Sequence, residues 1–321
     1  MRAIVVSELG GPEAMVLGEW PEPVAGPGQV VVEVAAAGVN FIDIYRRSGV
    51  YKQSVPYVPG SEGAGTVVAV AEDVHEFSVG DHVAWSEGGP GSYAERVAVT
   101  ASQAVPVPNG VDLRIAGAVM LQGLTAHYLC RSTFPVTEGT FAVVHAAAGG
   151  VGLLLTQLIK EFGGTVIATT SSTPKAALAK QAGADFVTTY EEFPAVVREV
   201  TGGRGADVVF DGVGKATFDA SLSVLRPRGM MVLFGGSSGQ VPPFDPQRLN
   251  SGGSLFVTRP TLAHYVADRT ELIWRAGDIF ERIAKASLHV RVGAEYTLAD
   301  APRAHEDLAA RRTTGKLLLV P

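Results

Sequence analysis

Eight residues at 145–152, HAAAGGVG, have the types and spacing to bind the phosphates of a nucleotide. They follow an apolar run at 141–144 that suits a buried strand, and they lead into 153–162, where apolar residues recur at helical spacing. A turn between strand and helix aims backbone N–H groups and the positive end of the helix dipole at one point. A pyrophosphate can bind there. The residues predicted to contact it are Ala148, Gly149, Gly150 and Val151.

The match to the dinucleotide fingerprint G-x-G-x-x-G is incomplete. Ala147 stands at the first glycine, whereas Gly149 and Gly152 occupy the other two positions. Alanine adds one methyl group at the turn and leaves open the position where a phosphate approaches. Because an ordinary turn between a strand and a helix would look similar, the surrounding segments must decide between the two interpretations.

Composition limits the class of protein. The chain has 321 residues, of which 46% are hydrophobic and 18% charged, enough for two domains with full cores. The formal net charge of −6 argues against nucleic acid as a partner. Cys130, the single cysteine, excludes an intramolecular disulfide. No apolar run reaches the roughly 18 to 20 residues that span a bilayer, and MRAIVVSELG carries no cleavage signature, so we expect a cytoplasmic protein that does not bind membranes.

Up to about residue 121, short β-like runs alternate with glycine and proline, which is typical of a small barrel or sandwich. These runs lie at 2–6, 29–34, 65–70, 82–85 and 95–99.

From about residue 123, apolar strands alternate with helical segments. The predicted strands lie at 141–146, 165–169, 185–189, 207–210, 230–234 and 254–257, and the helices between them at 153–162, 174–181, 191–200 and 216–225. Six strands with intervening helices predict an α/β fold with a doubly wound parallel sheet of the Rossmann type. The helix-like stretches at 270–285 and 298–310 and the strand at 316–320 break this alternation. We expect them to pack on the N-terminal domain, which makes the dinucleotide-binding domain an insertion.

The end of the second strand distinguishes NAD from NADP, because an acidic residue there binds the ribose hydroxyls and repels a 2′-phosphate. The segment 169–175, TTSSTPK, contains no carboxylate. Ser171 and Ser172 can donate hydrogen bonds to a phosphate and Lys175 can supply charge, which predicts NADPH. Alternatively, Ser172 only caps the following helix and Lys175 is solvated. The two roles are compatible.

Several blocks of sequence, in this order, resemble the medium-chain dehydrogenase/reductase superfamily and, within it, the zinc-independent NADPH:quinone oxidoreductases. They are GVNFIDIYRRSGVY at 38–51, PGSEGAG at 59–65, LQGLTAHYL at 121–129, HAAAGGVG, DGVG at 211–214, FGGSSG at 234–239 and SLFVTRP at 254–260. The resemblance covers essentially the whole chain. It implies a mostly β, GroES-like catalytic domain at 1–124 and 264–321, with the dinucleotide-binding Rossmann domain inserted at 125–263.

The resemblance also bears on metal. The superfamily's zinc alcohol dehydrogenases place a histidine where this chain has Ser61, and their other ligands, including all four of the structural zinc, are cysteines. With Cys130 alone, this chain cannot build a thiolate-rich site, and its histidines show no paired spacing. We therefore predict no metal site.

The resemblance further implies the remaining cofactor contacts. Tyr190, after the third strand, resembles the family tyrosine near the adenosine end. The loop at 234–239 and the segment at 257–259 flank the nicotinamide, Thr125 lies on the cofactor face at the domain junction, and Val213 is a weaker candidate. The residues expected to contact the cofactor here are Asn40, Thr125, Tyr190, Val213, Phe234, Gly235, Ser237, Val257 and Thr258.

On the acceptor side, Tyr45 and Tyr51 offer flat apolar surfaces for a quinone and phenolic protons, and Asn40 can hydrogen-bond the ribose or carboxamide. These three residues are the candidate catalytic residues. Half-buried packing explains both tyrosines equally well, and solvent could protonate the product instead. Asp43 is more typical of a residue that holds a loop than of a proton donor.

The expected function is hydride transfer from NADPH to a quinone or another conjugated acceptor. One alternative is reduction of the double bond of enals or enones, and another is noncatalytic NADPH binding, as in crystallin-like or RNA-binding relatives. The resemblance implies a homodimer, which the apolar edge strand predicted at 254–257 could form by extending one sheet into the next.

Overall fold

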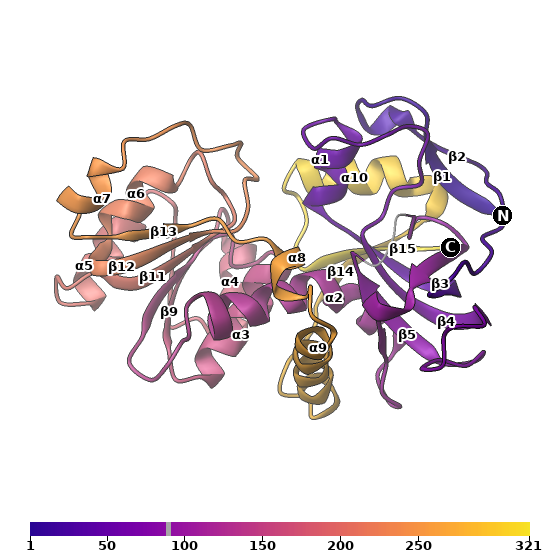
Figure 1. Cartoon of the computed structure of the whole chain (residues 1–321). Helices are drawn as coiled ribbons and strands as arrows, with labels where there is room; N and C mark the ends of the chain where they lie inside the picture. The colour runs from indigo at the N-terminus through magenta and orange to yellow at the C-terminus, as the bar shows by residue number, and fades with distance from the viewer. Residues whose placement is uncertain (88–90) are drawn as a thin grey trace. The chain divides into compact units, whose positions relative to one another are not determined.

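The computed structural model describes residues 1–87 and 91–321 and divides the chain into two compact units. Unit 1 comprises Met1–Leu124 and Val266–Pro321, and unit 2 comprises Thr125–Tyr265. Unit 2 is therefore inserted between two segments of unit 1, in the order that Figure 1 traces by colour. Among the described residues, no helix is long and apolar enough to cross a membrane.

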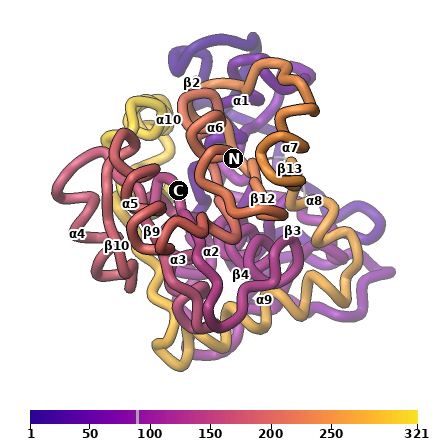
Figure 2. Tube along the Cα trace, turned by 90° about the vertical axis from the view of Figure 1, so that its left-hand side faces the viewer, coloured from indigo at the N-terminus to yellow at the C-terminus, as the bar shows by residue number. Residues whose placement is uncertain are grey.

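Unit 2 contains a six-stranded parallel sheet in the order β10-β9-β8-β11-β12-β13. β10 and β13 form its two edges. The helices that precede them, α4 (Thr173–Gln181) and α7 (Gln247–Ser251), lie at opposite margins of this unit in Figure 2. The strands are β8 (Phe141–Val144), β9 (Thr165–Thr169), β10 (Phe186–Thr188), β11 (Ala206–Asp211), β12 (Leu225–Leu233) and β13 (Phe256–Thr258). This is the predicted doubly wound architecture, which is confirmed.

Helices cover the sheet because alternate residues of its apolar strands point to opposite faces. The helices of unit 2 are α3 (Gly150–Glu161), α4 (Thr173–Gln181), α5 (Phe193–Val200), α6 (Phe218–Ser223), α7 (Gln247–Ser251) and α8 (Leu262–Tyr265). Val143, Ile167 and Val209 belong to one buried cluster with Phe193 of α5 and Leu222 of α6. α3 instead packs on β8 and β9, and α4 packs on α3 and β10. This buried core fixes the strand ends at which the candidate site lies.

Unit 1 is built on a seven-stranded sheet in the order β14-β15-β3-β4-β5-β7, with β6 paired to β3, and on the antiparallel pair β1-β2. Its strands are β1 (Arg2–Val6), β2 (Met15–Glu19), β3 (Gln29–Val39), β4 (Glu62–Val70), β5 (His82–Ser86), β6 (Arg96–Thr100), β7 (Ala104–Pro106), β14 (Val292–Thr297) and β15 (Lys316–Val320). The core contains Trp85 and Tyr93, both fully buried. β15 pairs with β3, so the C-terminal segment forms part of the same sheet as the N-terminal strands.

The helices of unit 1 are α1 (Phe41–Arg47), α9 (Arg269–Ala284) and α10 (Ala301–Ala309), with 3₁₀ turns at Pro12–Ala14, Ala101–Gln103 and Leu298–Asp300. α2 (Leu113–Tyr128) continues from unit 1 into unit 2 and ends in a π-helical segment, Leu129–Thr133.

Several element boundaries differ from the sequence prediction. The helix expected at 216–225 is α6, Phe218–Ser223, because β12 already begins at Leu225. The helix expected at 298–310 begins with a 3₁₀ turn, and only Ala301–Ala309 is α-helical. The strand expected at 254–257 is Phe256–Thr258, since Ser254 has a left-handed φ of 57° that a strand cannot contain. The strands β2, β7 and β14 and the helices α1, α2, α7 and α8 were not predicted.

Candidate functional site

The predicted cofactor residues of unit 2 follow the carboxyl ends of its strands, except for Val257 and Thr258, which lie within β13, and Thr125 in α2. Because the sheet is parallel, the carboxyl ends of all its strands lie on the same side of the sheet. From β8 the chain proceeds outward to β9 and β10 and then returns to place β11 on the other side of β8. Strand order reverses between β8 and β11, which is the position where sheets of this type bind ligands.

The turn after β8 is compact and backbone-lined. Ala146 has a φ of 50°, and its carbonyl accepts a hydrogen bond from the Gly149 N–H at 2.9 Å. Gly149 is the N-cap of α3, so the free N–H groups of the first helical turn begin at Gly150 and Val151. A Cβ at Gly152 would lie 2.5 Å from the Ala146 carbonyl oxygen, which explains this glycine by close packing of helix against turn.

Ala147 fits the first fingerprint position without strain. It is fully buried, and its N–H donates to the Thr169 carbonyl at 3.1 Å, so its methyl group points into the core instead of toward a ligand. The third strand also reaches this turn, because the Tyr190 hydroxyl accepts a hydrogen bond from the Ala146 N–H at 3.1 Å. Tyr190 thus lies beside the fingerprint, as a contact near the adenosine end requires.

The end of β9 presents hydroxyl groups to solvent. Ser171 and Ser172 are exposed, and Lys175 is half-buried in the first turn of α4. Ser172 is the N-cap of α4, but its side chain makes no capping hydrogen bond. The interpretation of Ser172 as only a helix cap requires such a bond, so the structure does not support it. No Asp or Glu occurs at 169–175. This arrangement suits a phosphate at a helix N-terminus and not a ribose with two free hydroxyls.

The loops after β11 and β12 are fastened to each other through their backbones. Ser238 donates its N–H to the Val213 carbonyl at 2.8 Å, and the Ser237 N–H donates to the Gly212 carbonyl at 3.2 Å. A Cβ at Gly235 would lie 2.6 Å from the Gly212 carbonyl oxygen. The glycines therefore permit two loops to touch, which builds a rigid rim around Val213, Phe234, Gly235 and Ser237.

The remaining predicted contacts of unit 2 are less well defined. Val257 and Thr258 lie in β13, where Thr258 pairs with Val232 of β12, so they stand at the same strand edge. Thr125 is buried in α2, at the first residue of unit 2.

In unit 1, Asn40 is held in a buried polar cluster. Its Nδ2 donates to Glu62 Oε1 at 2.7 Å and to the Gly38 carbonyl at 3.3 Å, and its Oδ1 accepts from Lys316 Nζ at 2.7 Å. Lys316 also pairs with Glu62, and both side chains are at most 1% exposed. Both amide hydrogens of Asn40 are thereby used, and Lys316 occupies one lone pair of its Oδ1, so only the second lone pair of Oδ1 is left to bind a ligand. The sequence did not indicate this second role.

Asp43 lies one helical turn further along α1 and is 1% exposed. Its carboxylate accepts hydrogen bonds from Ser61 Oγ at 2.5 Å and from the Asn40 N–H at 3.0 Å. Burial raises the pKa of Asp43 to about 6, although the Ser61 hydrogen bond and the charge of Lys316 oppose the rise. Asp43 therefore holds the start of α1, as predicted for a structural residue.

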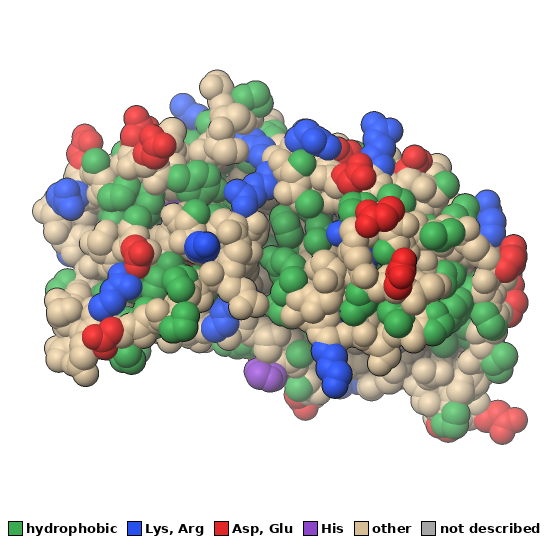
Figure 3. All heavy atoms as spheres, turned by 90° about the horizontal axis from the view of Figure 1, so that it is seen from above, with side chains coloured by type: hydrophobic (Ala, Val, Ile, Leu, Met, Phe, Trp, Pro, Cys, Tyr) green, Lys and Arg blue, Asp and Glu red, His purple; other side chains and the backbone are tan. Residues whose placement is uncertain are grey.

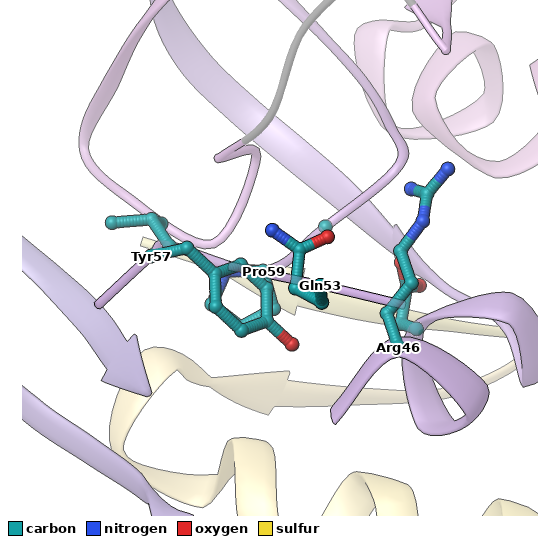
Figure 4. Close-up of a pocket in the computed structure, with 7 residues that line it drawn as sticks. Arg46, Gln53, Tyr57 and Pro59 are labelled. Atoms are coloured by element: carbon teal, nitrogen blue, oxygen red, sulfur yellow. The ribbon is translucent and has the colours of Figure 1, made fainter. Parts of the chain in front are cut away.

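A small pocket of unit 1 opens beside Asp43 (Figure 4). Arg46, Gln53 and Tyr57 contribute the other polar side chains of its lining. The Tyr57 hydroxyl is buried without a hydrogen-bond partner among the described residues, and burial, followed by the charge of Asp43, raises the Tyr57 pKa to about 12. The cavity volume is about 20 Å³, which is room for water and not for a quinone ring.

Tyr45 and Tyr51 pack against each other, with ring centroids 5.4 Å apart at an interplanar angle of 64°. Tyr45 is half-buried and Tyr51 is 39% exposed. The Tyr51 N–H also donates to the Tyr45 carbonyl at 3.0 Å. The structure therefore brings the two tyrosines together as one aromatic surface, which is compatible with both an acceptor-binding and a packing role.

Ser61, at the position of the zinc-binding histidine of alcohol dehydrogenases, is held in hydrogen bonds to protein side chains. Ser61 Oγ donates to Asp43 and accepts from Arg46 at 2.8 Å. Across 1–87 and 91–321, no group of three or more His, Cys, Asp and Glu side chains could hold a metal ion.

Comparison with known proteins identifies the family. The model for zinc-binding dehydrogenases matches residues 150–266, and the model for the alcohol dehydrogenase GroES-like domain matches residues 26–109. The quinone oxidoreductase of Pseudomonas aeruginosa is 42% identical over 323 residues, covering 100% of this chain and 99% of that protein. This chain belongs to the quinone oxidoreductase family of the medium-chain dehydrogenase/reductases.

Two further relatives agree with this assignment. The structure of Escherichia coli quinone oxidoreductase complexed with NADPH has a TM-score of 0.98 and 39% identity to this chain, with both chains covered in full. The 2-haloacrylate reductase of a Burkholderia species is 38% identical over 331 residues, covering 100% of this chain and 99% of that protein. The resemblance drawn from the sequence blocks is confirmed.

Sequence reasoning missed the buried polar groups that support the site. No role was assigned to Glu62, Lys316, Asp211 or His145. Glu62 and Lys316 each begin a strand, Asp211 ends one and His145 directly follows one. Asp211 in the block DGVG offered one signal, because a carboxylate at the end of a buried apolar strand must find hydrogen-bond donors.

Proposed function

We propose that this protein is an NADPH-dependent oxidoreductase that transfers hydride to quinones without zinc. The observation that carries the proposal is the end of β9. Ser171 and Ser172 are exposed directly before α4, and no carboxylate occurs in the segment 169–175. A 2′-phosphate is favoured there by the helix N-terminus and by Lys175. The relative from Escherichia coli, whose structure is described as a complex with NADPH, supports the same cofactor.

The residues of unit 2 bind and orient the cofactor. Gly150 and Val151 offer N–H groups to the pyrophosphate, while Gly149, whose N–H already donates to Ala146, keeps the turn free of a side chain. Tyr190 packs at the adenosine end. Val213, Phe234, Gly235 and Ser237 form the rim for the nicotinamide half, with Val257 and Thr258 beside it. When bound, NADPH supplies the hydride. The protein's part is to align donor and acceptor and to exclude water.

The acceptor is proposed to lie against Tyr45 and Tyr51, whose edge-to-face pair offers an aromatic surface. Asn40 contributes its carbonyl oxygen to the cofactor, since its amide hydrogens are used internally. Reduction of a quinone by hydride also requires a proton on oxygen. A phenol of either tyrosine can donate it, and so can solvent.

The test is a screen of NADPH oxidation by the purified protein with quinones, enones, alkenals and aldehydes, read as loss of NADPH absorbance. We expect the largest kcat/KM for quinones. An absence of quinone turnover despite tight NADPH binding would contradict the proposal and favour a noncatalytic, crystallin-like role. Metal analysis of the unchelated protein tests the zinc statement, since stoichiometric zinc would refute it.

One specific observation favours a second function. The 2-haloacrylate reductase relative is named for an acceptor with a conjugated carbon–carbon double bond, and it matches this chain at nearly the same identity as the quinone oxidoreductase of Pseudomonas aeruginosa. The same hydride geometry serves both acceptor types. A higher kcat/KM for 2-haloacrylates or enones than for quinones would establish the second function.

We further propose a cytoplasmic homodimer that does not bind nucleic acid. The Phe256 side chain of edge strand β13 is 55% exposed, and pairing of two such edges would bury it. Figure 3 shows Lys and Arg mixed with Asp and Glu over the visible face, which supports the absence of a basic stripe there. A monomer mass in sedimentation would contradict the dimer.

A further inference from the structure

A buried polar network lies directly beneath the strand ends of unit 2. It consists of Thr169, His145, Ser221, Asp211 and Thr217, and we call it the His145 network. His145 Nδ1 lies 2.8 Å from Thr169 Oγ1, and His145 Nε2 lies 2.9 Å from Ser221 Oγ. Each of these side chains is at most 2% exposed. A single imidazole thus joins the last residue of β9 to α6, the helix that comes after β11.

The direction of every hydrogen bond in the network follows from Asp211. Its Oδ1 accepts from the N–H groups of Val213 at 2.7 Å and Gly214 at 2.9 Å. Its Oδ2 accepts from Thr217 Oγ1 at 2.6 Å and from Ser221 Oγ at 3.4 Å. The Ser221 hydroxyl has one proton, and when it donates this proton to Asp211 Oδ2 at 3.4 Å its oxygen accepts from His145 Nε2–H at 2.9 Å.

With the proton on Nε2, His145 Nδ1 is an acceptor, and the Thr169 hydroxyl donates to it. This requires a neutral imidazole. Burial lowers the pKa of His145, although the charge of Asp211 opposes the effect, so the neutral form is favoured. Phe193 contacts the same ring edge to face at a centroid distance of 4.9 Å.

The network connects the two halves of the candidate cofactor site. Thr169 immediately precedes the hydroxyl-rich end of β9, whereas Asp211 holds Val213 and Gly214 in the loop after β11. His145 itself is the first residue after β8 and precedes the fingerprint turn. One side chain therefore links the carboxyl ends of β8 and β9 to the helix after β11, and so joins strands on both sides of the position where strand order reverses.

We propose that His145 is a positioning residue that fixes the relative placement of the adenosine and nicotinamide halves of the NADPH site by joining Thr169 to Ser221. The inference rests on the proposed function, since it concerns the same cofactor. It assigns no chemistry to His145, which is buried and acts through its neighbours.

The test compares dissociation constants for NADPH, measured by fluorescence titration at pH 7.5 and at a temperature where every variant is folded. His145→Phe retains a ring and removes both hydrogen bonds, and we expect the Kd to rise about 10-fold, the loss of roughly one net hydrogen bond. Thr169→Val and Ser221→Ala each remove one link and should raise the Kd about 3-fold. These two variants keep the imidazole and test the proposal even if His145→Phe does not fold.

A matched control separates positioning from general stability. Phe193→Leu disturbs the same core beside the imidazole but removes no hydrogen bond, so it should lower Tm and leave the Kd within about 2-fold. His145→Gln retains a donor for Ser221 and should restore part of the affinity. The double variant His145→Phe/Ser221→Ala should bind no more weakly than His145→Phe, because both act through one chain of contacts.

Three results would overturn the proposal: a Kd for His145→Phe within about 2-fold of wild type, additive effects in the double variant, or an equal rise for Phe193→Leu. Failure of the wild-type protein to bind NADPH would instead overturn the proposed function, and this inference with it.

Discussion

The Tyr93 hydroxyl lies 3.0 Å from His305 Nε2, and the two rings meet edge to face at a centroid distance of 5.7 Å. Arg47, which can only donate, lies 3.4 Å from His305 Nδ1, so the proton of this imidazole is on Nε2. His305 then donates to Tyr93, whose hydroxyl donates to Asp43 Oδ2 at 3.3 Å. The chain of hydrogen bonds points at Asp43 and makes α1 and α10 interdependent.

The first prediction concerns acid sensitivity. Burial, with the charge of Arg47, lowers the pKa of His305 from 6.5 to about 3. Between these values the unfolded chain binds a proton that the folded chain does not, so His305 contributes stability that is complete above pH 6.5 and is lost as pH falls toward 3. His305 contributes at most about 1.4 kcal/mol per pH unit to the slope of the unfolding free energy against pH. His305→Gln keeps a donor for Tyr93. It should lessen the dependence of the unfolding free energy on pH between pH 5 and 7, measured by urea unfolding at each pH. His264→Gln, at an exposed position, is the control, and an unchanged slope in His305→Gln would contradict the assignment.

The second prediction is that Asp43 makes stability depend on pH in the opposite direction to His305. Its folded pKa of about 6 exceeds the ordinary value of 3.8, so the folded chain binds the extra proton between these values. The resulting stability is complete below pH 3.8 and is lost as pH rises through 6, by up to about 3 kcal/mol. The difference in unfolding free energy between wild type and Asp43→Asn should therefore fall from pH 4.5 to pH 7.5. A difference that rises with pH would show that the three donors around the carboxylate outweigh its burial.

The ion pair of Lys316 with Glu62 carries the third prediction. Lys316→Met leaves Glu62 buried and unpaired beside Asn40, which costs about 3–5 kcal/mol of unfolding free energy. The double variant Lys316→Met/Glu62→Gln removes both charges and should recover most of that loss. Lys285→Met, which breaks an exposed pair with Glu281, should change stability by less than about 1 kcal/mol. Equal losses at Lys316 and Lys285 would contradict the account.

The periodicity of apolar residues predicted the architecture because this pattern depends only on residues that are near one another in the sequence. Apolar strands alternating with helices specify a parallel sheet, and the fingerprint lies where a strand meets a helix. The support of the site is not local. Lys316 and Glu62 are 254 residues apart and Tyr93 and His305 are 212 apart, so only the folded chain shows that they touch. Likewise, Asn40 has the chemistry of a ligand-binding residue, and only its contacts in the folded chain reveal that its amide hydrogens are already used.

The fourth prediction separates phosphate recognition from helix capping at the start of α4. If Lys175 contacts a 2′-phosphate, Lys175→Ala should raise KM for NADPH about 10-fold or more and leave KM for NADH nearly unchanged. Lys180→Ala makes the same change of charge in the last turn of the same helix, at an exposed position, and should affect neither cofactor. Steady-state kinetics with each nucleotide provide the measurement. Equal effects of Lys175→Ala on both cofactors would refute the assignment.

The last prediction tests the geometry of the fingerprint. A methyl group at Gly152 would lie 2.5 Å from the Ala146 carbonyl oxygen and 2.7 Å from Ala147 Cα, so Gly152→Ala must push α3 away from the turn. We expect a loss of about 1–3 kcal/mol of stability and weaker NADPH binding. Gly277 provides the matched control, because it is exposed in α9 and a methyl group there would meet no neighbouring atom within 4 Å, so Gly277→Ala should stabilise the protein by up to about 1 kcal/mol. Thermal unfolding and NADPH titration of both variants decide the matter. If Gly152→Ala bound NADPH as wild type does, the turn would be more adaptable than its contacts imply, and the pyrophosphate would have to be held elsewhere.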